Sequence, residues 1–467
     1  MLHYATTPAL NRRAALKLGA CGFGYLAFAG LSTERARAEK TDPLAQKEPH
    51  FPAKAKRVIF LCMSGGPSHV DTFDYKPKLT ADNGKAPPAG SGRGFQSGSL
   101  LGSPFQFAQH GKSGLWMSEL FPELAKHADE LCLLNGMHTN VPAHPQAFLQ
   151  MHTGTSQFVR PSLGAWTLYG LGTVNQNLPG FVSVNPPTQN GGAQNYGSAF
   201  LPAIYQGTRI GSEGRAVAGA KVSNIANPKL GTDTQRAQLD FVQSLNKEQL
   251  AQDKVNPQVE GVIESYELAF RMQRDVPKVM DLSAESKETQ NLYGVNDRES
   301  ADFGRQCLLA RRFLEAGVRY VEVTHGNWDQ HRNLKADLQR HGTAIDKPIA
   351  GLIADLKRKD MLKDTLIVWS GEFGRTPFAQ GGTDGRDHNN KGFSAWMAGG
   401  GVKGGFVHGK TDDYGAEAVA GKVHTHDFHA TILHLLGLDH EKLTFKYAGR
   451  DFRLTDVHGT VVREILA

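Results

Sequence analysis

Short apolar runs alternate with longer amphipathic segments along much of the chain. Each run is bounded by turn residues and is too short for a membrane helix, which predicts buried strands. These strands cover Val58–Met63, Leu131–Leu134, Phe181–Val184, Arg319–Val323, Leu366–Trp369 and Ser394–Ala398. Helical spacing occurs between them, as in the apolar set Ile345, Ile349, Leu352, Ile353 and Leu356. Because strands that alternate with crossover helices form parallel sheets, we expect an α/β fold with a mainly parallel central sheet and helices on both faces.

The pattern changes between about residues 185 and 300. Residues 185–235 are rich in Gly, Asn and Pro, which indicates irregular structure. From Asp233 to about Leu292 the chain is polar and helical, with few strand signals. We therefore predict a helical and irregular insertion at about 185–300, whose helical segment could cap a site and carries no chemical motif.

Residues 1–38 have the pattern of a targeting segment. Arg12-Arg13 precede the weakly apolar run Leu18–Leu31, and Ala36-Arg37-Ala38 gives a small-x-small cleavage site. Twin arginines before such a run are typical of a Tat signal peptide; an ordinary Sec signal is the alternative. We expect an exported, periplasmic bacterial protein with a linker at 39–56 and one domain at 57–467. No later segment reaches the ~18 apolar residues that a membrane-spanning helix needs.

Polar side chains follow four of the predicted strands. Because the carboxyl ends of parallel strands meet at one edge of a sheet, where α/β folds place their sites, we expect these groups to lie close together. In chain order the groups are His69, Asp71 and Asp74; His138 and His144; Asp329 and His331; and Glu372, Arg375, Asp384, Asp387 and His388.

This set contains the ligands that a catalytic divalent ion requires. Three side chains can hold such an ion and leave one coordination position open. Asp329 and His331 lie two apart, on the same side of an extended segment. His388 offers a third ligand and Glu372 a fourth, and we include Asp387 and Asp71 as further candidates. Asp71 alternatively caps a helix or forms a turn, and a lone exposed His or Asp is more often ordinary surface. The identity of the ion stays open between Zn and Ca or Mg.

Composition and motifs exclude several other classes. The formal net charge is +6, but Lys and Arg form no stripe and have no interleaved aromatic residues, so nucleic-acid binding is unsupported. Cleavage after Ala38 leaves Cys62, Cys132 and Cys307, which make neither a disulfide framework nor a CxxC metal site. The chain has no GxSxG elbow, no Walker loop and no GxGxxG segment that opens a helix.

Several separate motifs, in order, resemble the DUF1501 family of exported bacterial proteins, within the alkaline phosphatase/sulfatase-like superfamily. The motifs are Gly65–Asp74 (GGPSHVDTFD), Trp328–His331 (WDQH), Gly371–Pro377 (GEFGRTP), Gly385–Asn389 (GRDHN) and Gly399–Gly405 (GGGVKGG). The resemblance runs from about residue 56 to the C-terminus. It implies the superfamily fold and hydrolysis of phosphate or sulfate esters with one or two metals and a Ser, Thr or modified-Cys nucleophile.

Carried over by position, Asp329, His331 and His388 resemble the ligands of one metal. Glu372 stands where the Asp-His pair of a second metal begins, but Phe373 replaces its His. The nucleophile position falls on His144, which leaves a phosphohistidine nucleophile, a metal ligand and a non-catalytic replacement as alternatives.

Arg375 is a candidate to clamp a tetrahedral anion bidentately. The alternative is a buried structural pair with Asp384 or Glu372. Asp71 is a nearby substitute for the metal-binding Asp that the superfamily places at the end of the first strand.

Two functions follow from the motifs. One is an exported metal-dependent hydrolase that acts on phosphate or sulfate esters. The other is a catalytically inactive member of the superfamily that binds an anionic glycan or a partner protein. Cytochrome-like proteins often accompany this family, which makes a cytochrome-like partner conceivable. The sequence does not choose between phosphate and sulfate, and it does not give the oligomeric state.

Overall fold

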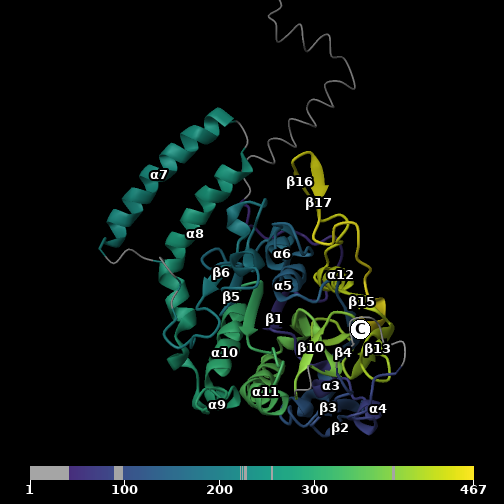
Figure 1. Ribbon diagram of the computed structural model, residues 1–467. Helices are drawn as coiled ribbons and strands as arrows, with labels where there is room; N and C mark the ends of the chain where they lie inside the picture. Colours follow the sequence, from purple (N-terminus) through teal and green to yellow (C-terminus); the bar gives the residue numbers. More distant parts are fainter. Residues whose placement is uncertain are drawn as a thin grey trace, which may run out of the picture.

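A computed structural model of the protein describes residues 42–467 except 89–97, 221, 223, 224, 226–228, 254, 255 and 381–383 (Figure 1). The expected signal peptide at 1–38 lies outside the described residues. Residues 42–56, the expected linker, pack against the domain. Leu44 is buried there, and the backbone N–H groups of Lys54 and Ala55 donate to the Leu435 carbonyl at 2.9 and 2.8 Å.

The central sheet is mainly parallel, as the sequence predicts. Its strand order is β12-β4-β11-β8-β1-β7-β5-β6, and β15 pairs with β4. The strands are β1 (Arg57–Met63), β4 (Leu131–His138), β5 (Phe181–Val184), β6 (Thr208–Ile210), β7 (Tyr320–His325), β8 (Thr365–Ser370), β11 (Phe393–Ala398), β12 (Phe406–His408) and β15 (Val423–His424). Only β11 runs against its neighbours, β8 and β4. The middle strands β1, β7 and β8 are almost entirely buried, which explains why they read as continuous apolar runs.

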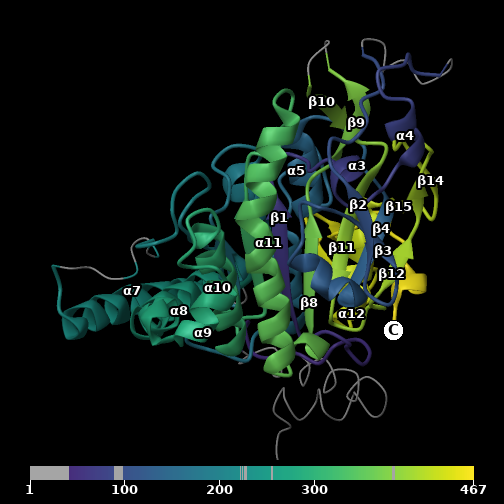
Figure 2. The same cartoon turned by 90° about the horizontal axis from the view of Figure 1, so that it is seen from below.

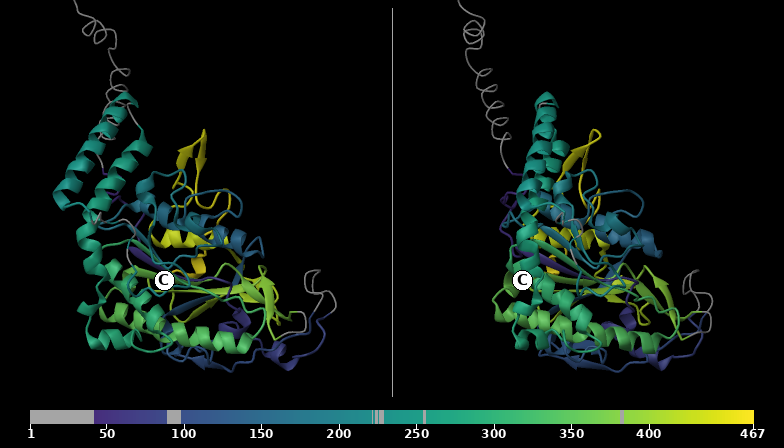
Figure 3. Two further views of the ribbon diagram at one scale, coloured as in Figure 1. Left: turned by 60° about the vertical axis from the view of Figure 1, so that its left-hand side comes forward. Right: turned by 90° about the vertical axis from the view of Figure 1, so that its left-hand side faces the viewer.

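Helices cover both faces of this sheet (Figures 1 and 3). One face carries α10 (Ala301–Glu315) and α11 (Leu334–Arg358), and the other carries α5 (His144–Thr153), α6 (Leu163–Leu171) and α12 (Thr425–Leu435). The apolar stripe of α11 that the spacing predicts is fully buried, from Ile345 to Leu356. The expected α/β class with helices on both faces is therefore confirmed.

The helical part of the predicted insertion projects from the domain. Helices α7 (Thr232–Asp253) and α8 (Pro257–Met280) lie side by side and are followed by α9 (Lys287–Leu292). Figures 1 and 2 show this pair far from the hairpin of β9 (Gly374–Ala379) and β10 (Arg386–Asn389). The two long helices therefore do not cap the edge of the sheet from which that hairpin extends.

The remaining helices and strands of the described residues are α3 (His69–Thr72), α4 (Pro77–Ala81), β2 (Phe107–His110), β3 (Leu115–Ser118), β13 (Lys410–Thr411), β14 (Ala418–Ala420), β16 (Phe445–Tyr447) and β17 (Arg450–Phe452). Single turns of 3-10 helix connect several of them.

The loops after β1 and β7 meet at the carboxyl edge of the sheet. The Ser64 N–H donates to the His325 carbonyl at 3.0 Å, and the Trp328 N–H donates to the Ser64 carbonyl at 3.0 Å. Gly65 has a φ of +116°, and a Cβ there would lie 2.7 Å from the Trp328 nitrogen. Only glycine permits this backbone approach, which holds the two loops together.

The segment after β8 differs from the loop that the sequence suggests. It forms the antiparallel hairpin of β9 and β10, in which His388 pairs with Arg375. The hairpin carries both side chains back over the edge of the sheet. The strand pattern is hard to see in the sequence because charged residues and Pro377 interrupt it.

Candidate metal centre

Four side chains meet at the carboxyl edge of the sheet: His144, Asp329, His331 and His388. Each offers a ligand atom, and these atoms lie within 4.8 Å of one another. His144 is the first residue of α5, Asp329 and His331 follow β7, and His388 lies on β10. Separations of this size suit one ion with metal–ligand bonds of roughly 2 Å.

The Oδ1 atom of Asp329 is the centre of the cluster. It lies 2.9 Å from Nε2 of His331, 3.3 Å from Nε2 of His144 and 3.5 Å from Nε2 of His388. The Nε2 atoms of His331 and His388 are 3.1 Å apart. Three imidazoles therefore present the same ring nitrogen to one carboxylate oxygen.

The other nitrogen of each ring is held by an acceptor. His388 Nδ1 donates to the Pro142 carbonyl at 2.6 Å, and His144 Nδ1 donates to Glu372 Oε1 at 2.7 Å. His331 Nδ1 donates to Gln380 Oε1. These bonds favour the tautomer whose lone pair is on Nε2, the form that binds a metal. The donor set therefore fits a divalent ion such as zinc.

The electrostatics of the cluster favour a charged Asp329. Burial opposes the charge, but His144, His388 and Arg375 hold the pKa of Asp329 well below its usual range. Burial also opposes a charge on His144, yet the neighbouring carboxylates of Asp329 and Glu372 raise the pKa of His144 to about 9. An anionic oxygen thus lies among nitrogen ligands, which suits a cation.

Glu372 lies behind His144 and outside the four-residue cluster. Its side chain is buried, and both carboxylate oxygens accept from the Gly65 N–H at 3.1 Å. Together with the bond to His144, these contacts make Glu372 a support for the ring. The structure therefore gives this predicted ligand a positioning role.

Arg375 does not have the position of an anion clamp. Its side chain is fully buried, and its guanidinium donates to the carbonyls of Gly66 at 2.9 Å, Trp328 at 3.2 Å and Gly65. Its acidic partner is Asp329, at 2.6 Å, and not Asp384 or Glu372 as the structural alternative proposed. The guanidinium is already paired with Asp329 and with the carbonyls of Gly65 and Gly66. Because it is not exposed to solvent, it cannot bind an anion from outside.

Asp71 and Asp387, the other two predicted ligands, also lie outside the cluster. The Asp71 carboxylate forms a fully buried bidentate pair with Arg386, at 2.7 and 3.0 Å, and accepts from Ser68 Oγ at 2.5 Å. Asp387 is exposed, and its Oδ1 accepts from the His388 N–H at 2.8 Å. Asp71 thus pairs with a buried arginine, and Asp387 accepts from a backbone N–H group, as Asp commonly does at turns.

A cavity of about 390 Å³ opens beside the cluster. Its lining residues are Ser64, Gly65, His144, Thr188, Gln189, Asn190, Glu213, Gly214, Asn327 and Asp329. Those between 188 and 214 come from the irregular half of the insertion, in which the sequence analysis named no candidate residue. Glu213 is therefore a lining residue that the sequence analysis did not name. The available signal was its place just after the edge strand β6, another strand that ends at this edge.

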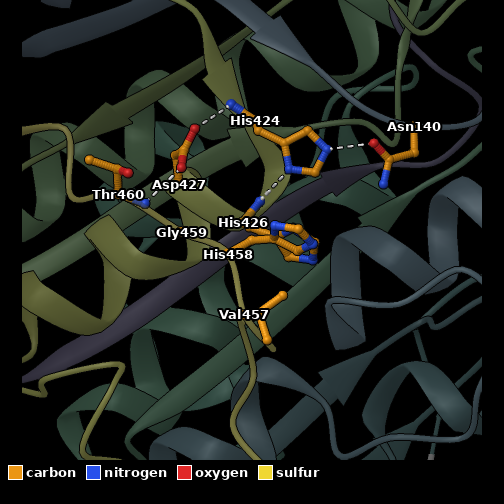
Figure 4. Close-up of a pocket in the computed structure, with 8 residues that line it drawn as sticks. All are labelled: Asn140, His424, His426, Asp427, Val457, His458, Gly459 and Thr460. Carbon is orange, nitrogen blue, oxygen red and sulfur yellow. Dashed lines mark hydrogen bonds between the residues drawn. The ribbon is translucent and has the colours of Figure 1, made fainter.

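A second hollow, of about 500 Å³, lies at the start of α12 and contains His424, His426 and His458 (Figure 4). Both nitrogens of His424 are engaged: Nδ1 accepts from the His426 N–H at 3.2 Å, and Nε2 faces Asn140 Oδ1 at 2.9 Å. Asp427 accepts from the N–H groups of His424 and Thr460. These contacts cap the helix, so His424 and Asp427 serve the fold.

Comparison with known protein families decides the family. The model of DUF1501, described as a protein of unknown function, matches residues 55–466. The chain belongs to the DUF1501 family. The resemblance seen in the motifs of this DUF1501 protein is thereby confirmed. A sequence search among curated proteins finds no match.

Solved structures similar to this DUF1501 protein include sulfatases and a phosphatase. The PsFucS1 sulfatase from Pseudoalteromonas sp. has 13% identity and a TM-score of 0.38, with 89% of this chain and 72% of that chain covered. LtaP, a lipoteichoic acid synthase from Listeria monocytogenes, has 9% identity and a TM-score of 0.37, covering 90% and 79%. TAB5 alkaline phosphatase has 12% identity and a TM-score of 0.34, covering 83% and 99%.

The described part of the chain has no helix that is long and apolar enough to cross a membrane.

Proposed function

We propose that this DUF1501 protein is a metal-dependent hydrolase of phosphate or sulfate esters that acts outside the cytoplasm. One observation carries the proposal: three imidazoles whose outer nitrogens are fixed by hydrogen bonds present Nε2 to a single carboxylate oxygen beside a cavity. Export by the twin-arginine route belongs to the proposal and rests on the sequence pattern at 1–38.

Asp329, His331 and His388 hold the ion in this proposal. Three protein ligands leave an open position, which is the arrangement of catalytic sites. A bound divalent ion supplies Lewis acidity to the ester oxygen and to water. Phosphate and sulfate esters both offer oxygen atoms of suitable geometry for that position.

His144 acts on the substrate beside the ion. It lines the cavity, and its 2.7 Å bond to Glu372 fixes the direction of the ring. An imidazole at this place can bind a non-bridging oxygen of the ester or exchange a proton with it. His144 and the three ligands can therefore be told apart by metal content. Removal of the His144 side chain should leave the ion bound, whereas removal of a ligand should not.

The test uses the metal content and the turnover of the same purified variants. We expect wild type to hold about one divalent ion per chain and to cleave 4-nitrophenyl phosphate or 4-nitrophenyl sulfate. His388→Ala should lose both the ion and turnover. His144→Ala should keep the ion and lose turnover by about 100-fold or more, the usual contribution of a proton-transfer group.

Asp387→Asn is the matched control, because Asp387 neighbours His388 but points away from the cluster. It should match wild type in metal content and turnover. A protein without a bound metal would contradict the site. A stoichiometric ion with no turnover of either ester would contradict the hydrolase and favour a non-catalytic binding protein.

A further inference from the structure

Glu213 is the one acidic side chain of the cavity that the metal centre does not use. The cavity wall contains two carboxyl groups, Asp329 and Glu213. Asp329 faces three imidazoles and Arg375, so it has no proton to give. Glu213 comes from the loop after β6 and is half-buried.

The loop that carries Glu213 is held in place on the sheet edge. The Glu213 N–H donates to the Pro186 carbonyl at 3.1 Å, and Asn185 Nδ2 donates to the Arg215 carbonyl at 3.0 Å. The carboxyl lies beside the Ser64 side chain, which also lines the cavity. It also packs over Gly326, where a Cβ would lie 2.0 Å from Glu213 Oε1. The carboxyl is thus positioned between the loops that follow β1 and β7, the latter of which carries Asp329.

Burial raises the pKa of Glu213 above its usual value despite the nearby Ser64 side chain, which acts in the opposite direction, and the charge of Glu372 adds to the rise. This direction extends the pH range in which the carboxyl keeps its proton. A neutral carboxylic acid in a cavity beside an electrophilic centre is the form that donates a proton to a leaving group.

We propose that Glu213 is the general acid that protonates the leaving alcohol, and that the substrates are esters of aliphatic alcohols. This inference rests on the proposed function. The oxygen of water bonds to the phosphorus or sulfur atom, and the bond from that atom to the bridging oxygen breaks. The electron pair stays on the bridging oxygen, which takes the Glu213 proton and leaves as the alcohol. The proton lost by the attacking water restores the Glu213 carboxyl through solvent.

The cavity wall agrees with an aliphatic, hydrogen-bonding alcohol. Thr188, Gln189, Asn190 and Asn327 offer hydroxyl and amide groups, and the described lining has no aromatic side chain other than the His144 ring. An alkoxide of this kind is a poor leaving group and needs a proton, whereas 4-nitrophenolate leaves without one.

The leaving-group dependence of Glu213→Gln tests the proposal. We would measure kcat/KM for the 4-nitrophenyl ester and for the 2-hydroxyethyl ester, using whichever of phosphate or sulfate wild type cleaves. Glu213→Gln should lower the value for the 2-hydroxyethyl ester by about 100- to 10,000-fold and that for the 4-nitrophenyl ester by less than about 3-fold. The alkaline limb of the pH profile for the 2-hydroxyethyl ester should also disappear.

Gly326→Ala supplies a second variant, because its Cβ displaces the carboxyl without removing it. It should show the same selective loss. Glu260→Gln, on the exposed surface of α8, is the matched control and should behave as wild type. Equal losses for both esters, or no loss for either, would overturn the role of Glu213 while the hydrolase stands. Failure of wild type to cleave any ester would overturn the proposed function, and this inference with it.

Discussion

Gln380 is placed to influence a metal ion bound at the cluster without contacting it. Its side-chain oxygen accepts from His331 Nδ1 and so fixes the nitrogen that faces Asp329. Outer hydrogen bonds of this kind typically change metal affinity by about 10- to 100-fold. The sequence offers no sign of this role, because an isolated Gln in a glycine-rich turn carries no motif.

Gln380→Ala should therefore weaken metal binding by about 10- to 100-fold without unfolding the protein. Competition with a chromogenic chelator measures the affinity, and the melting temperature of the metal-free variant checks the fold. Gln339→Ala, on the exposed face of α11, is the control. An unchanged affinity for Gln380→Ala would mean that the ring of His331 is oriented by its packing.

The clustering of Asp329, His331 and His388 was within reach of the sequence. Asp329, His331 and His388 were predicted because all follow buried strands that end at the same edge. The observed partners of Arg375, Asp71 and Glu372 were not predicted. Sequence spacing gives the edge at which a side chain lies, but it does not show whether the charge faces the cavity or is already paired within the protein.

Among the elements, the β9–β10 hairpin depends on one buried ion pair. Arg386 on β10 binds Asp71 at the start of the domain, and both side chains are fully buried. Removing one partner of such a pair leaves an uncompensated charge out of water, which costs about 3–5 kcal/mol.

Asp71→Ala should lower the free energy of unfolding by about 3–5 kcal/mol. Urea titration followed by circular dichroism measures the change. Asp413→Ala is the comparison, since Asp413 pairs with Lys78 at 3.3 Å on the exposed surface, where solvent screens the pair, and its removal should change the stability little. A similar small effect for both variants would show that the hairpin is held by its other contacts.

The sequence predicted the core elements better than the connections. Strand Phe181–Val184 was predicted with the observed bounds, and the stripe of α11 was correct, because burial imposes apolar residues at fixed spacing. The hairpin at 374–389 and the course of residues 185–214 were missed. Their positions depend on long-range contacts such as Arg375 with Gly65 and Gly66, which no local pattern encodes.

For the whole molecule, buried neutral histidines set the response to acid. His429 is fully buried, and its Nε2 donates to the Met151 carbonyl at 2.6 Å. Burial lowers the pKa of His429 to about 3. In the unfolded chain a His has a pKa of about 6.5. Between these two values only the unfolded state binds the proton, so the stability that is present above pH ~6.5 falls as the pH decreases.

We expect the free energy of unfolding to fall by up to about 1.4 kcal/mol per pH unit for this histidine between pH ~6 and ~4. Urea titrations across that range measure the slope. His429→Gln should have a shallower slope than wild type because it removes the titrating group. An identical slope in the variant would assign the acid response to other groups.

The pairing of Arg375 with Asp329 has a consequence for how a metal ion would bind at the cluster. The Arg375 guanidinium neutralises the Asp329 carboxylate from the protein side. The carbonyls of Gly65, Gly66 and Trp328 hold the guanidinium in that position. The cluster is therefore preorganised: its side chains already have their positions before an ion binds. A site of nitrogen and oxygen ligands binds several first-row divalent metals, with affinities that follow the Irving–Williams order. The identity of the metal in the purified protein should then depend on which metals were available when the protein was produced.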